Sequence, residues 1–129
     1  MTMKKELTEE EALSIVLGEH PEFRRQWEDG TLPDEIIGDD GEPMSPRMHI
    51  TIHTIVERQL SADDPRGVAF ISQELEQLGV SSHDIRHEIG RAVASQLWYM
   101  EKEGCAFDEG KYLAELKQIV AAHKLDNDG

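Results

Sequence analysis

Helix-start signals recur along this chain of 129 residues, and apolar residues at helical spacing follow them. Thr8 followed by Glu11 has the pattern of a capping box, in which each side chain bonds to the other residue's backbone N–H. Ser45 precedes Pro46, which is the order of a serine N-cap and a proline at the first helical position. Further helix starts are expected at Asp64-Pro65, at Ser81 or Ser82, and at Asp108. No segment shows the period-two alternation of a β-hairpin, so the fold class is predicted as all-α.

The helix signals predict a compact bundle of four main helices and a short helical N-terminal extension. The bundle helices are expected at about residues 46–60, 65–78, 82–103 and 109–124. Residues 1–44 are expected to form the N-terminal helical segment and an irregular connection, which is rich in Gly, Pro and Asp from Gly30 to Met44. Residues 45–124 are expected to hold the bundle core, within one domain that covers residues 1–129.

Charge and apolar content narrow the possible partners. The 13 Lys and Arg residues stand against 27 Asp and Glu residues, and a net charge of -14 repels phosphate backbones and anionic lipid surfaces. The chain start lacks the apolar core of a signal peptide, and no apolar run approaches the roughly 20 residues that span a bilayer. A single cysteine, Cys105, fits a reducing compartment. We expect a cytoplasmic protein without nucleic-acid or membrane partners; protein partners and the oligomeric state stay open.

Four of the six histidines form two H-x3-H pairs, His49 with His53 and His83 with His87, and Glu57 extends the first pair by one turn. Residues four apart on a helix share a face, with Cβ atoms about 5–6 Å apart, so two imidazoles at this spacing can bind one ion. These five residues are the predicted metal ligands. Imidazole and carboxylate donors suit zinc, iron, nickel or manganese better than calcium.

Both histidine pairs are expected to face the interior. On a helical wheel the first pair lies among Ile52, Val56 and Leu60, and the second shares a face with Gly90 and Ala94. An unsatisfied buried polar group costs about 1–3 kcal/mol, which a bound metal would offset. The small residues would let the facing helix approach closely. Whether the two histidine helices are neighbours is left open.

The other two histidines carry weaker expectations. His20 precedes Pro21 and could add a ligand, but a residue in this position is more often a helix cap or a surface residue. His123 lies near the end of the last predicted helix and is expected to be exposed.

The ordered motifs resemble a bacterial family, domain of unknown function family 1841. The matching segments are His20-Pro21-Glu22-Phe23, Pro46-Arg47-Met48-His49 with His53 and Glu57-Arg58-Gln59, Asp64-Pro65-Arg66-Gly67-Val68, His83 with His87, Leu97-Trp98, and Asp108-Glu109 with Tyr112-Leu113. The family pattern has a second histidine where this chain has Arg24, and a glutamate where it has Arg91. The resemblance implies a shared fold and site but no reaction, and the two arginines argue against a symmetric dinuclear centre.

Three functions are compatible with these histidines and with Glu57. The first is a metal-binding protein with one transition-metal ion held tightly between two helices, where it stabilises the fold. The second is a metal-dependent enzyme or oxygen-binding protein, in which only some of the five residues bind and one coordination position stays free. The third is a metal-free interaction module, in which the histidines and Glu57 form a buried polar network with Arg91 or with backbone groups. The first is the favoured hypothesis.

Overall fold

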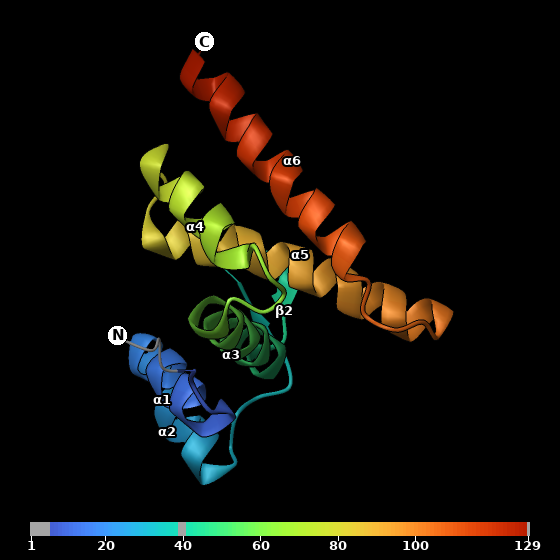
Figure 1. Cartoon of the computed structure of the whole chain (residues 1–129). Coiled ribbons are helices and arrows are strands. Elements are labelled where there is room, and N and C mark those ends of the chain that lie inside the picture. The colour runs from blue at the N-terminus through green and yellow to red at the C-terminus, as the bar shows by residue number, and fades with distance from the viewer. Residues whose placement is uncertain (1–5, 39–40, 129) are drawn as a thin grey trace.

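The computed structural model describes residues 6–38 and 41–128 (Figure 1). The helices are α1 (Glu9–Glu19), α2 (Pro21–Asp29), α3 (Pro46–Ala62), α4 (Val68–Gln77), α5 (Ser82–Glu103) and α6 (Glu109–Asp128). Two short strands, β1 (Ile36–Ile37) and β2 (Pro43–Met44), pair antiparallel within the connection between α2 and α3. The all-α prediction is confirmed, and the described part of the chain adds only this small ladder, whose strands are too short to show an alternating pattern.

Most of the predicted caps close the helices as expected. Thr8 and Glu11 form the reciprocal capping box, with N···O distances of 3.1 and 3.2 Å. The Ser45 hydroxyl accepts a hydrogen bond from the Met48 N–H, which fixes the start of α3. The same arrangement recurs at Ser81 with the Asp84 N–H and at Asp108 with the Lys111 N–H. These contacts lie within three residues, so local sequence is enough to predict them.

The helix predicted at about residues 65–78 was expected to start at Asp64-Pro65, and this start is wrong. Helix α4 begins at Val68, and Gly67 at its N-cap has a φ of 108°, which favours glycine. The capping side chain is Asp63, whose Oδ1 accepts hydrogen bonds from the N–H groups of Gly67 and Ala69, each at 3.0 Å. Asp63 therefore bridges the turn between α3 and α4.

Helix α3 lies between two apolar cores. On one side Val16 and Leu17 of α1 pack against Ile50. On the other side the larger core joins α3 to α4, α5 and α6, and its buried members are Val56, Val68, Ile71, Leu75, Ile85, Ile89, Ala92, Val93, Tyr112, Leu116 and Val120. Figure 1 shows α1 and α2 on one side of α3, with α4, α5 and α6 on the other. The N-terminal segment is thus a packed layer, although the sequence suggested only an extension.

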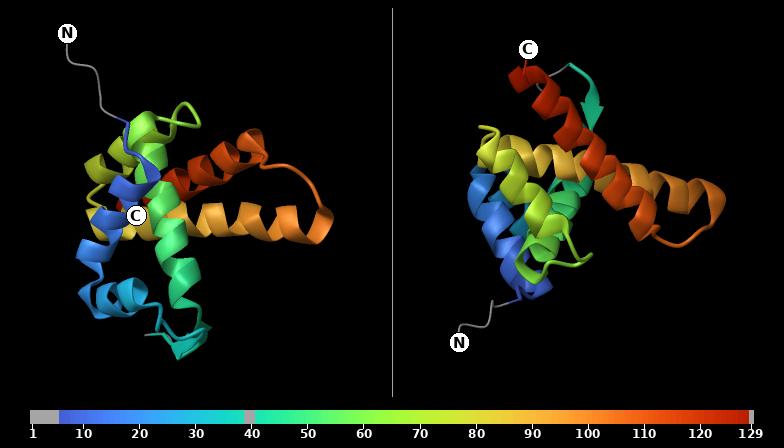
Figure 2. Two further views of the ribbon diagram at one scale, coloured as in Figure 1. Left: turned by 90° about the horizontal axis from the view of Figure 1, so that it is seen from below. Right: turned by 45° about the horizontal axis from the view of Figure 1, so that its top comes forward.

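Helices α3 and α5 are neighbours and cross at a steep angle, as the left view of Figure 2 shows. Gly90 is buried at this crossing, and a Cβ built there would lie 3.2 Å from Cγ2 of Ile52. The missing side chain lets the two backbones approach, which is the role expected for a small residue beside the second histidine pair. The crossing brings the two H-x3-H pairs to the same part of the molecule.

No helix in the part of the chain that the structure describes combines the length and apolar character needed to cross a lipid bilayer.

Candidate metal centre

Five histidines gather where the junction of α1 and α2, the first half of α3 and the start of α5 meet. The ring centroids of His49 and His53 are 4.5 Å apart, and the His20 ring lies 5.0 Å from the first and 5.2 Å from the second. The His87 ring lies 4.9 Å from the His53 ring, and the His83 ring lies 4.4 Å from the His87 ring. The structure therefore joins both predicted pairs and adds His20.

His20 is held in place by the backbone of α1. Its Nδ1 lies 2.8 Å from the carbonyl oxygen of Val16. A carbonyl only accepts hydrogen bonds, so Nδ1 carries the proton and, in the neutral ring, Nε2 keeps a lone pair. A histidine that binds a metal commonly donates its other ring N–H to a carbonyl in this way.

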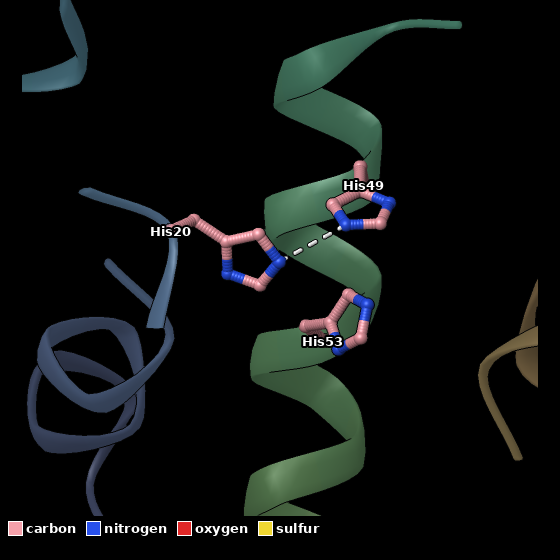
Figure 3. Close-up of side chains that lie close together, drawn as sticks. All are labelled: His20, His49 and His53. Carbon is pink, nitrogen blue, oxygen red and sulfur yellow. Dashed lines mark hydrogen bonds between the residues drawn. The ribbon is translucent and has the colours of Figure 1, made fainter. Parts of the chain in front are cut away.

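The free nitrogen of His20 faces His49 across a short gap, which Figure 3 marks with a dashed line. The two Nε2 atoms are 3.2 Å apart. Without an ion, the His49 N–H can donate to the lone pair of His20. Two nitrogens bound to one tetrahedral zinc at about 2.0–2.1 Å lie roughly 3.3 Å from each other. The observed separation matches the edge of such a tetrahedron.

His53 completes a group of three on the same side of α3 (Figure 3). One ring nitrogen from each of His20, His49 and His53 can be chosen so that all three lie within 4.8 Å of one another. Among the described residues, this is the group of three or more side chains whose donor atoms lie close enough to share an ion. These three side chains are therefore the candidate ligands of a single ion.

The surroundings favour the neutral form of His49, His53 and His87. Burial, followed by the charges that His49 and His87 would carry, lowers the pKa of His53 from 6.5 to about 3. Burial, followed by the charge that His20 and His87 would carry, lowers the pKa of His49 to about 4. Burial is also the largest cause that lowers the pKa of His87. A neutral imidazole has the lone pair that a metal needs, so His49 and His53 can offer a nitrogen to an ion near pH 7 without first losing a proton.

Glu57 is buried one helical turn after His53, but its carboxylate pairs with an arginine. Its Oε1 accepts a short hydrogen bond from Nε of Arg86, on α5. Nη1 of Arg86 also donates to the hydroxyl of Ser82 at 2.5 Å. Arg91, which the sequence suggested for such a network, is exposed. The role of Glu57 as a metal ligand stays a prediction.

The second pair is less buried than the first. His53 is buried and His49 is half-buried, whereas His87 is half-buried and His83 is exposed. His83 and His87 approach the group of three from the start of α5, and their binding to the same ion also stays a prediction.

A pocket of about 270 Å³ adjoins the histidines. It lies between the end of α1, the middle of α3 and the start of α5. Its lining residues are Glu19, His20, His53, Ser82, His83 and Arg86. Two of the three clustered histidines therefore form part of its wall.

Sequence reasoning underrated His20 and did not identify Arg86. His20 depends on the packing of α1 against α3, which has no local sequence signal. Arg86 had a usable signal, because it lies three residues after His83 and therefore near the same face of the helix. The expectation that His123 is exposed is also wrong: it is half-buried in α6, and its Nε2 lies 2.9 Å from both carboxylate oxygens of Glu88.

Comparison with known proteins agrees with the motif order. Neither the curated proteins nor the solved structures contain a match to this chain. Residues 2–118 match the family described as "Domain of unknown function (DUF1841)". This match covers nearly the whole chain, including the five clustered histidines and Glu57. The chain belongs to the DUF1841 family.

Proposed function

We propose that this protein binds one transition-metal ion through His20, His49 and His53. The observation that carries the proposal is the 3.2 Å separation of the two Nε2 atoms of His20 and His49, in a group of three histidines that each offer one ring nitrogen within 4.8 Å of the others. This spacing is the one that a tetrahedral ion imposes on its ligands. A hydrogen bond between the rings also explains the spacing, so an experiment has to separate the two.

Two further features support metal binding. The carbonyl of Val16 fixes the protonated nitrogen of His20 and leaves the other nitrogen directed at His49. The lowered pKa values of His49 and His53 reduce the competition between protons and metal at neutral pH. A lone exposed histidine has neither feature.

The other predicted ligands have secondary places in this proposal. His87 is beside the group of three, and His83 is one helical turn further out. Glu57 forms an ion pair with Arg86, and this contact fixes the position of Arg86 in the wall of the pocket. A site made of three imidazoles favours zinc, iron or nickel, whereas manganese favours oxygen donors.

Metal analysis of untagged protein tests the proposal. Wild-type protein is treated with a chelator, dialysed, and titrated with zinc, iron(II) or nickel while binding is followed by calorimetry and the thermal midpoint by circular dichroism. We expect one equivalent of at least one ion to bind. Stabilisation should reach about 2.7 kcal/mol when the free ion is 100 times its dissociation constant.

Single substitutions identify the ligands. His49→Ala and His20→Ala should each weaken binding by at least tenfold. His123→Ala is the matched control, because His123 is a half-buried histidine outside the cluster, and this variant should keep the wild-type affinity. Failure of all three ions to bind or to raise the thermal midpoint would contradict the proposal.

A second candidate is a metal-free interaction module with a buried polar network. The hydrogen bonds from Arg86 to Glu57 and to Ser82 favour it, because they satisfy a carboxylate that the metal would otherwise bind. Within residues 6–38 and 41–128, every fully buried side-chain nitrogen and oxygen has a hydrogen-bond partner. His53→Leu separates the two functions: a variant with raised stability, together with a wild type that binds no metal, supports the network.

A further inference from the structure

We infer that the pocket beside His20 and His53 admits a small anion, of the size of a simple carboxylate, that binds the metal ion directly. This inference rests on the proposed metal site and adds a ligand to it. It departs from the sequence-based expectation of a closed site with four or five protein ligands. The pocket, the number of donors and the local charges each contribute to the argument.

The donor set leaves room on the ion. Three side chains among the described residues place their donor atoms within 4.8 Å of one another, and His87 is not one of them. Catalytic zinc sites typically have three protein ligands and a fourth position for an exchangeable molecule, whereas structural sites have four protein ligands. The group of three therefore has the composition of an open site.

The pocket provides access to that position. Its volume of about 270 Å³ exceeds the roughly 30 Å³ share of a water molecule, so it has room for several waters or one small organic anion. His20 and His53 belong to both the pocket wall and the group of three. Glu19, Ser82 and His83 are exposed residues of the same wall, so the pocket is continuous with solvent. A molecule can reach the ion without unfolding the site.

The local charges select an anion. Three neutral imidazoles do not reduce the charge of a divalent ion, in contrast to thiolate or carboxylate ligands. The positive charge of Arg86 and the negative charge of Glu57 offset each other in their ion pair. Glu19 is the carboxylate among the residues that line the pocket, and it is exposed and therefore screened by solvent. The ion keeps most of its charge, which favours a negatively charged ligand.

The wall also offers a donor to such a ligand. The Ser82 hydroxyl accepts a hydrogen bond from Arg86, which leaves its own proton available for donation. This group can orient a carboxylate whose other oxygen binds the ion.

Cobalt(II) gives the test a direct readout. The full-length protein is loaded with one equivalent of cobalt(II), and its visible absorption spectrum is recorded during titration with azide and, separately, with formate. We expect a saturable change in the spectrum with each anion, because a ligand that enters the coordination sphere alters the cobalt transitions.

Two substitutions locate the bound anion. Glu19→Gln removes a negative charge from the wall and should tighten azide binding by about twofold, whereas the control Glu10→Gln, elsewhere on α1, should leave it unchanged. Ser82→Trp reduces the entrance and should weaken azide binding at least fivefold, with Ser14→Trp as its control. All four variants should keep the cobalt spectrum.

The outcomes separate the two proposals. A cobalt spectrum that does not respond to 100-fold excesses of azide and formate overturns the open position and leaves metal binding intact. An equal response in wild type, Glu19→Gln and Ser82→Trp overturns the assignment to this pocket. Absence of cobalt, zinc, iron and nickel binding overturns the metal site and this inference together.

Discussion

The buried position of His53 predicts that the metal-free protein loses stability between pH 7 and pH 5. Its side chain is 7% exposed, and burial is the main reason why its pKa falls from 6.5 to about 3. Between these two values the unfolded chain binds a proton at His53 that the folded chain does not. Stability from this residue is therefore complete above pH 6.5 and decreases as the pH falls toward 3.

The size of the effect follows from the pKa difference. At pH 5 the unfolded histidine is 1.5 pH units below its pKa of 6.5, whereas the folded residue is still neutral, so His53 alone lowers the free energy of unfolding by about 2 kcal/mol. His49 and His87 act in the same direction. Their side chains are less buried, so each should contribute less than His53.

Urea denaturation of chelator-treated protein at pH 7 and pH 5 measures the effect. The net charge of -14 also becomes smaller as the pH falls, which affects stability in wild type and variants alike, so the informative quantity is the difference between them. His53→Leu and His53→Gln both remove the titrating group, and only the first adds apolar surface. Each variant should lose about 2 kcal/mol less stability than wild type between the two pH values.

An equal loss of stability in wild type and both variants would refute the reasoning. It would mean that the His53 ring takes up a proton in the folded protein without cost, through solvent access or a rearranged cluster.

Three further predictions concern the packing around the site. Glu57→Gln leaves Arg86 without its anionic partner and should lower the free energy of unfolding by about 1–3 kcal/mol; if Glu57 is no ligand, calorimetry should still show one bound ion per chain. Gly90→Leu forces a side chain against Ile52 and should destabilise the protein by about 2 kcal/mol or more and weaken metal binding, whereas Gly90→Ala should change stability by less than about 1 kcal/mol. Ser45→Ala removes the cap of α3 and should cost about 1 kcal/mol in urea denaturation, with no change in metal stoichiometry.

Helix starts were predictable from sequence because their determinants are local. Thr8, Ser45, Ser81 and Asp108 each bond to a backbone N–H three residues ahead, so a four-residue window contains the whole interaction. The start of α4 was misplaced for a related reason. Asp63 caps α4 across a turn, through N–H groups that lie four and six residues ahead of it. Asp64-Pro65 has the pattern of a helix start but does not form one.

The candidate site was only partly predictable, because its remaining members depend on tertiary packing. The spacing of His49 and His53 reveals a shared helix face, but the position of His20 depends on how α1 and α2 meet α3. The acidic partner of Arg86 is 29 residues away in sequence. An inward Glu57 shows that a compensating group is needed without showing whether it is a metal or an arginine.

The position of His20 between two helices has a consequence for how fast an ion could leave. His20 ends α1 and precedes Pro21 of α2, so a movement that lifts this junction from α3 also withdraws one nitrogen from His49 and His53. The residence time of an ion held by all three would then depend on the local opening of the α1–α2 layer. Hydrogen exchange in α1 and the rate of ion release would therefore rise and fall together.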